Sequence, residues 1–128
     1  LDVKTFKDLV GGRGTQPLIN LKKEDIVADA IDLMKKYDIE NIPVMEAETS
    51  VGAISAGGLF NKILSNPDIK SQTIESVMEK PYPEVAFETP VERLSSFITK
   101  ENGAVLSKDE SGTIHIVTKY DIIQSLTK

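Results

Sequence analysis

Apolar residues recur at helical spacing in three segments of the first half of the chain. In residues 6–10, 27–34 and 59–64 they fall at positions i, i+3 and i+4, which places them on one face of a helix. Asp25 stands just before the second segment and is the expected N-cap. The spacing therefore predicts three helices, the last of which ends near Asn66.

Short apolar runs between these helices predict strands. Residues 17–21 form one such run and predict a single short strand. The runs 42–45 and 51–55 flank a polar turn, a pattern typical of a β-hairpin. The first half therefore has the predicted order strand, helix, strand, strand, helix, preceded by one short helix.

The second half carries clearer start and stop signals. The sequence Thr-Pro-Val-Glu at 89–92 is a capping box with proline at the first helical position, and Asn-Gly at 102–103 is the expected end of that helix. The runs 104–108 and 113–118 predict two strands joined by a polar turn. Apolar residues from Ile122 onward predict a final helix.

The two halves repeat the same order of elements. The short helix at 6–10 corresponds to 74–78, and the later elements correspond in turn. Each repeat has about 60 residues, too few to bury much apolar area alone. The sequence predicts an α+β protein in which repeat 1 (1–66) and repeat 2 (67–128) pack together and share a core.

Composition narrows the classes of function. The chain has 128 residues and a net charge of −5, with its 15 Lys and Arg scattered among 20 Asp and Glu, which disfavours nucleic acid and anionic membranes as partners. Without cysteine there is no thiol nucleophile and no thiolate metal site, and one histidine argues against zinc. The missing cysteines and the lack of a membrane-length apolar run favour a cytoplasmic protein, and leucine at position 1 suggests a piece of a longer chain.

The ordered motifs resemble a known family. They are Val27–Met34, Ile42-Pro-Val44, Gly52–Ser55 and, in the second repeat, Ile116–Ile122. This doubled β-α-β-β-α pattern resembles a tandem cystathionine-β-synthase (CBS) domain pair, also called a Bateman module. The resemblance covers nearly the whole chain and implies two repeats packed as a pseudo-twofold pair.

A closer resemblance involves the second repeat. Its turn at 101–105 and its ending at 118–126 resemble the C-terminal regulatory region of cystathionine β-synthases. That family uses pyridoxal phosphate in a catalytic domain upstream of the regulatory region. The resemblance implies that such a domain precedes this chain in its parent protein.

Thr118 and Asp121 form the sharpest candidate site. They stand where the last predicted strand enters the last predicted helix. The resemblance implies that an adenosine compound binds in a cleft between the repeats, where the Asp121 carboxylate accepts hydrogen bonds from the ribose 2′- and 3′-hydroxyls. A hydroxyl and backbone N–H groups at a helix N-terminus also favour a phosphate or carboxylate. The alternative is that Asp121 complements the helix dipole and Thr118 caps the helix.

The resemblance also implies which residues form the wall of that cleft. Small and apolar residues of both repeats suit the faces of an adenine ring. Besides Thr118 and Asp121, the expected ligand-binding residues are Gln16, Pro17, Leu18, Ile39, Gly103, Ala104, Ile114, Lys119 and Tyr120. For the leucine and the two isoleucines, plain core packing is the alternative. The tyrosine could stack on a ring or cover the mouth of the cleft.

The corresponding residues of the first repeat are Ser55 and Gly58. Gly58 stands 63 positions before Asp121, so this position offers no ribose acceptor. We therefore expect a degenerate first site and one competent site per chain, the one that contains Asp121.

Other chemical motifs are weak. Gly-Gly-Arg-Gly at 11–14 lacks the strand–loop–helix context and the Lys-Ser/Thr ending of a P-loop, so a flexible linker is the simpler interpretation, although Arg13 could reach an anionic ligand. Ser55 resembles a nucleophile elbow, but its sole candidate base is His115, which strand alternation places on the solvent or interface side. No acidic pair suits general acid–base catalysis.

These observations favour a regulatory module over a stand-alone enzyme. In the leading interpretation it binds S-adenosylmethionine or AMP, ADP or ATP, holds no intrinsic cofactor and controls an upstream domain of the same polypeptide. A triphosphate is the weaker choice because few cations other than Lys119 and Arg13 are placed to meet it. The alternative is a ligand-free interaction module that forms a homodimer through apolar residues such as Phe60, Ile123 and Leu126.

Overall fold

The computed structural model describes residues 4–13 and 17–127 of the chain. By their contacts these residues divide into two compact units. The central unit is Ile19–Pro81, and the terminal unit combines the residues up to Leu18 with those from Tyr82 onward. Each unit contains helices and one small antiparallel sheet, which confirms the predicted mixed α+β class.

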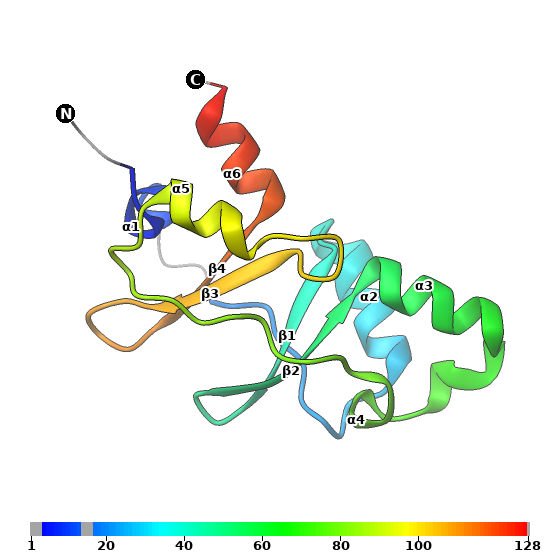
Figure 1. The fold of residues 1–128 in the computed structure, drawn as a ribbon. Helices are drawn as coiled ribbons and strands as arrows, with labels where there is room; N and C mark the ends of the chain where they lie inside the picture. Colours follow the sequence, from blue (N-terminus) through cyan, green and yellow to red (C-terminus); the bar gives the residue numbers. More distant parts are fainter. Residues whose placement is uncertain (1–3, 14–16, 128) are drawn as a thin grey trace. The chain divides into compact units, whose positions relative to one another are not determined.

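The central unit is built on one β-hairpin (Figure 1). Strands β1 (Asn41–Glu46) and β2 (Thr49–Ser55) pair antiparallel with Ile42 opposite Ile54, as the alternating runs predict. The helical elements of this unit are α2 (Val27–Tyr37), α3 (Ala56–Ser65), the 3-10 helix η1 (Pro67–Ser71) and α4 (Ile74–Val77). Helices α3 and α4 contact β2, and η1 contacts both α2 and α3.

Buried aliphatic side chains form the core of the central unit. Val27, Ile42, Val44 and Ile74 are fully buried, and Leu21 is nearly so. Four successive residues of β1 are buried, which means that both faces of this strand are covered. The apolar residues of 27–34 face this core and supply one side of it, as their spacing predicts.

The terminal unit repeats the same plan with both ends of the chain. Strands β3 (Ala104–Lys108) and β4 (Ile114–Thr118) pair antiparallel. Its helical elements are α1 (Phe6–Val10), α5 (Val91–Leu94), the 3-10 helix η2 (Ser95–Phe97) and α6 (Lys119–Leu126). Figure 1 shows α1 in blue and α6 in red, the first and last helices of the chain, which contact each other. Phe6, Leu94, Val105 and Val117 are fully buried in its core.

The short helix of each repeat lies in the unit formed by the other repeat. The Phe6 N–H donates to the Thr89 carbonyl and the Val91 N–H donates to the Lys4 carbonyl, both at 2.9 Å, so the starts of α1 and α5 are tied together. The central unit ties the starts of α4 and α2 in the same manner. The compact units therefore differ from the sequence repeats 1–66 and 67–128, and that repeat boundary stays a prediction.

The strand predicted at 17–21 is wrong in extent. Leu21 alone forms a bridge to β1: its N–H donates to the Pro43 carbonyl at 3.0 Å and its carbonyl accepts from the Met45 N–H at 2.8 Å. The run passes from the terminal unit into the central unit after Leu18. Its apolar residues therefore serve two different units rather than one ladder.

The predicted N-cap of α2 is also wrong. The cap is Ile26, whose N–H donates to the Asp29 carboxylate at 2.9 Å. The Asp25 carboxylate instead accepts the Lys22 N–H at 2.8 Å in the preceding turn. Asp29, three residues after the N-cap, thus supplies the capping carboxylate that the sequence predicted at Asp25.

Neither predicted boundary of the 89–102 helix is correct. Helix α5 begins after Pro90, and the Thr89 hydroxyl donates to the Ala86 carbonyl at 2.6 Å instead of capping it. Helical structure ends at Phe97, whose carbonyl accepts the Asn102 side-chain amide at 2.7 Å. Pairing with the segment before α1 sets the start, which local sequence cannot show.

Across the described residues, every helix is too short or too polar to cross a bilayer.

Candidate functional site

Asp121 lies in the first turn of α6, directly after β4 ends at Thr118. Its Oδ2 atom accepts the Thr118 N–H at 2.8 Å and the Thr118 hydroxyl at 3.1 Å. This contact closes the N-terminus of α6, as the capping alternative predicts. The carboxylate still reaches solvent, since the Asp121 side chain is 26% exposed.

A third donor, Arg13, meets the same carboxylate oxygen. Its Nη2 lies 2.8 Å from Asp121 Oδ2, and its Nη1 donates to the Ile116 carbonyl at 2.5 Å. Both side chains are only partly exposed, which strengthens the pair relative to a fully solvated one. The linker residue expected to reach an anionic ligand therefore binds a carboxylate of the protein itself.

Gly103 and Ala104, two residues expected in the cleft wall, lie beside the start of α6. The Gly103 carbonyl accepts the Lys119 N–H at 3.3 Å, and Ala104 is the ladder partner of Thr118. Ala104 is fully buried, so it is a core residue. The structure thus brings Gly103 and Ala104 close to Thr118 and Lys119.

The other predicted wall residues are more dispersed. Tyr120 is 65% exposed, and its hydroxyl accepts from the Gln124 amide at 2.9 Å. Ile114 is partly buried at the far end of β4, opposite Lys108. Within the terminal unit, Pro17 is exposed and Leu18 half-buried; Ile39 packs on the core of the central unit, and Gln16 lies outside the described residues. Their roles in ligand binding stay predictions.

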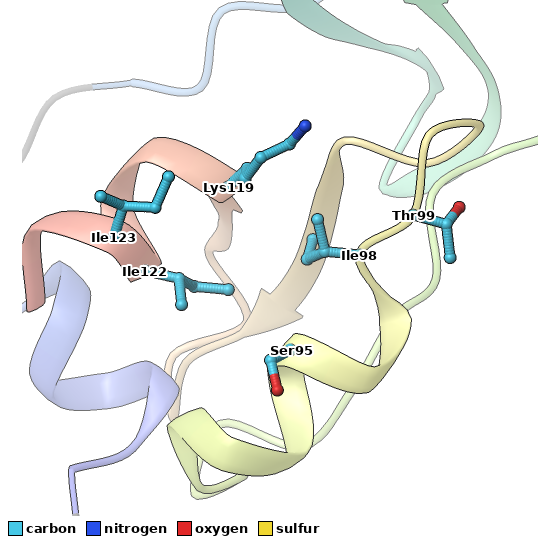
Figure 2. Close-up of a pocket in the computed structure, with 6 residues that line it drawn as sticks. All are labelled: Ser95, Ile98, Thr99, Lys119, Ile122 and Ile123. Atoms are coloured by element: carbon cyan, nitrogen blue, oxygen red, sulfur yellow. The ribbon is translucent and has the colours of Figure 1, made fainter. Parts of the chain in front are cut away.

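An open apolar pocket of about 370 Å³ adjoins α6 in the terminal unit. Figure 2 shows Ile98 and Ile122 pointing toward each other across the space between η2 and α6, with Lys119 at its edge. The six lining residues are Ser95, Ile98, Thr99, Lys119, Ile122 and Ile123. Its volume suits a small molecule. Of the predicted ligand residues, Lys119 alone is among them.

In the first repeat, a carboxylate lies where position 58 has no side chain. Ser55 caps α3 by accepting the Gly58 N–H at 3.1 Å, and its hydroxyl donates to Glu79 Oε1 at 3.3 Å. A Cβ atom on Gly58 would stand 2.5 Å from that same Oε1. The Glu79 backbone is fixed on β2 by paired hydrogen bonds with Ala53, at 2.8 and 3.0 Å. The acceptor missing from Gly58 is thus replaced by one from another segment.

The two units therefore share a construction at the start of the helix that follows the hairpin. In each, the segment after the short helix brings a charged side chain to the start of that helix. In the central unit this side chain is Glu79, and the helix contributes Gly58. In the terminal unit it is Arg13, and the helix contributes Asp121. The carboxylate thus comes from the segment after the short helix in the central unit and from the helix itself in the terminal unit.

Comparisons with known proteins agree with this architecture. Residues 7–65 match the family model of the CBS domain. The structure of the CBS domain protein NE2398 matches with a TM-score of 0.85 and 20% identity, covering 99% of this chain and all of that one. The chain folds as a tandem CBS domain pair. The solved CBS pair of protein MJ0100 gives a TM-score of 0.78 at 22% identity over 98% of this chain and 97% of its own.

A third CBS structure is more distant. That of CBSX2 matches with a TM-score of 0.67 and 21% identity, over 88% of this chain and 89% of its own. Curated protein sequences give no significant match. At these identities the structural likeness establishes the fold alone. The predicted CBS-pair fold is confirmed, and the link to cystathionine β-synthase stays a prediction.

His115 forms a second polar cluster in the β3–β4 hairpin. Its Nε2 lies 2.9 Å from Asp109 Oδ2, and its ring stands 5.7 Å from that of Phe87. Hydrogen bonds from His115 and Ser111 hold the pKa of Asp109 well below its ordinary value. With 21% of its side chain exposed, His115 is more buried than a solvent-side histidine. In the described residues no cluster of acidic or histidine side chains is arranged for a metal ion.

Sequence reasoning missed Glu79 and the binding partners of Arg13. Glu79 follows Ser55 by 24 residues and belongs to repeat 2, and Arg13 precedes Ile116 by 103 residues. Both contacts arise because each short helix packs in the unit formed by the other repeat, and recognising this exchange would have predicted them. The matched segments 6–10 and 74–78 already showed that the residues after them are equivalent.

Proposed function

We propose that this CBS pair is a regulatory module that binds an adenosine-containing small molecule at the start of α6. The observation that carries the proposal is the arrangement of Asp121. All three of its donors among the described residues meet Oδ2, which leaves Oδ1 to accept from a ligand. A carboxylate at this position can accept from ribose hydroxyls. Backbone around Gly103 and the apolar pocket beside Ile122 offer polar and apolar surfaces nearby.

Related structures support the class of ligand. The MJ0100 pair was solved with 5′-methylthioadenosine and S-adenosylmethionine, and CBSX2 was solved with AMP. For this chain S-adenosylmethionine and AMP are favoured over ATP. The Arg13 guanidinium is already paired with Asp121, and Lys119 lines the adjoining pocket. The regulated partner we propose is an upstream domain of the same polypeptide, of the pyridoxal-phosphate cystathionine β-synthase type.

A specific observation favours a second function, homodimer formation. Helices α3 and α6 each expose large apolar side chains: Phe60 is 62% exposed, Leu64 66%, Ile123 50% and Leu126 72%. Phe60 and Ile123 are equivalent in the two repeats, 63 positions apart. Exposed apolar side chains gathered on one element are typical of interaction surfaces. Sedimentation of the wild type and of Ile123→Lys tests this, because a dimer formed through α6 should dissociate in the variant.

Thermal unfolding with added ligand tests the sensor proposal. At 100 times its dissociation constant, a ligand adds about 2.7 kcal/mol, which for a domain of this size raises the midpoint by about 8–16 °C. We expect such a shift with S-adenosylmethionine or AMP and its loss in Asp121→Ala. Asp29→Ala is the matched control, because Asp29 accepts the N-cap N–H of α2 at 2.9 Å as Asp121 does in α6.

The control separates capping from binding. Asp29→Ala should lower the unliganded midpoint and keep the ligand shift. If no adenosine compound stabilises the wild type, the sensor proposal is wrong and the module is an interaction unit. Catalytic turnover of any of these compounds would instead point to an enzyme.

A further inference from the structure

We propose that the Arg13 guanidinium occupies the Asp121 carboxylate in the ligand-free protein, and that a cis-diol ligand displaces it and so loosens the segment after α1 (residues 11–13). This inference rests on the proposed function at Asp121. It goes beyond that function because it links occupancy of the site to a defined part of the chain.

The first observation is that Arg13 is held from two sides. One terminal nitrogen of its guanidinium meets Asp121 Oδ2 at 2.8 Å, and the other meets the Ile116 carbonyl at 2.5 Å. Both acceptors belong to the β4–α6 junction, and the Arg13 side chain is 34% exposed. The guanidinium therefore ties the segment after α1 to the start of α6.

The second observation is that Asp121 Oδ2 is crowded with donors. It accepts the Thr118 N–H at 2.8 Å, the Thr118 hydroxyl at 3.1 Å and the Arg13 Nη2 at 2.8 Å. A carboxylate oxygen offers about two lone-pair positions. A cis-diol that donates to both oxygens of the carboxylate must therefore remove one of these donors.

Arg13 is the donor that can leave. The Thr118 N–H is held by the N-cap backbone, with φ −106° and ψ 170°, and cannot move without unwinding the first turn of α6. Arg13 follows Gly11 and Gly12, and a Cβ on Gly12 would meet nothing within 4 Å. The space beside Gly12 is open, and the long Arg13 side chain can swing out. Because a ligand shifts a conformation by its differential affinity, diol binding favours the released state.

The central unit supplies a comparison within the same chain. There the equivalent segment brings Glu79 to Ser55, and the helix has Gly58 in place of a carboxylate. That unit lacks an arginine–carboxylate pair at this place, so it has no comparable tie to release. The release of a segment is therefore a property of the terminal unit.

The rate of cleavage by an arginine-specific protease measures how firmly Arg13 is held by Asp121, because the protease must bind the arginine side chain in its own pocket. The chain has two arginines, and Arg93 in α5 serves as an internal control for general unfolding of the same unit. In ligand-free protein we expect Asp121→Asn to speed cleavage after Arg13 about two- to fivefold, the range for a partly exposed ion pair. Cleavage after Arg93 should change far less. Equal rates at Arg13 in wild type and variant, or equal acceleration at both arginines, would overturn the tie.

Adenosine tests the displacement, since it carries the cis-diol but no phosphate that could hold Arg13 in a new place. Saturating adenosine should speed cleavage after Arg13 in the wild type and leave Arg93 unchanged. In calorimetry, Arg13→Gln should bind adenosine about two- to fivefold more tightly, because the diol no longer competes with the guanidinium. Slower cleavage with adenosine, or weaker binding by Arg13→Gln, would overturn the displacement. Failure of both proteins to bind adenosine overturns the displacement, whereas the thermal shifts with S-adenosylmethionine and AMP decide the proposed function and the ligand-free digestion decides the tie.

Discussion

Gly57 and Gly58 are neighbours in α3 that should respond oppositely to the same substitution. A Cβ on Gly57 would meet nothing within 4 Å, whereas a Cβ on Gly58 would stand 2.5 Å from Glu79 Oε1 and 2.9 Å from Ser55 Oγ. Both glycines lie within a helix of ten residues and neither has a positive φ. The pair therefore separates the intrinsic gain of alanine from the cost of crowding the Glu79 carboxylate.

The magnitudes follow from the contacts. Alanine in place of glycine within a helix gains about 1 kcal/mol of stability. Gly57→Ala should show most of this gain. At Gly58 the same gain is opposed by loss of the Ser55 cap, about 1 kcal/mol, and of the Ser55–Glu79 hydrogen bond, about 0.5–1 kcal/mol. Gly58→Ala should thus be neutral or destabilising by up to about 1 kcal/mol, a difference of roughly 1–2 kcal/mol between the variants.

Urea unfolding of the two variants measures this difference. Adding Glu79→Ala to each variant completes a double-mutant cycle: it should recover part of the lost stability with Gly58→Ala and none with Gly57→Ala. Equal stabilisation by both alanines would refute the reasoning, because it would show that the Glu79 carboxylate does not occupy the space above Gly58.

Other consequences can be measured on the same protein. Leu94→Ala should lose about 2–4 kcal/mol of unfolding free energy, since Leu94 is fully buried, whereas the 72%-exposed Leu126 should tolerate alanine within about 0.5 kcal/mol. Ala47→Gly should stabilise the β1–β2 hairpin by about 0.5–1 kcal/mol, because Ala47 has φ 55°, and a lower midpoint would contradict this. Because the pKa of Asp109 is lowered by His115 in the folded state, its stabilisation is present above the unfolded pKa of about 3.9 and is lost as the pH falls below it. The stability gap between wild type and Asp109→Asn should therefore narrow below about pH 4, and a gap independent of pH would count against this contact.

The sequence predicted what local spacing controls. Helices at 6–10, 27–34 and 59–64, both hairpins and the final helix all appear, because their apolar faces repeat within a few residues. The start of α6 at Thr118 and the closeness of Gly103 to it were also predictable, since adjacent strands β3 and β4 set both.

The sequence did not predict what distant segments control. Thr89 fails as a cap because the start of α5 is tied to the segment before α1. The run 17–21 fails as a strand because it passes between units. Glu79 and Arg13 reach their partners only through the exchange of short helices, a long-range feature that neither propensity nor spacing records.

That exchange also sets an order for folding. The central unit is one continuous stretch, Ile19–Pro81, whereas the terminal unit must join residues up to Leu18 with those beyond Tyr82. Closing a loop costs more entropy as its length grows, so contacts of the terminal unit are favoured once the intervening chain has become compact. We expect the amides of β1 and β2 to gain protection in pulsed hydrogen exchange before those of Phe6 and Val91, which join the two parts of the terminal unit. Helix α1 therefore packs into the terminal unit after the central unit has formed.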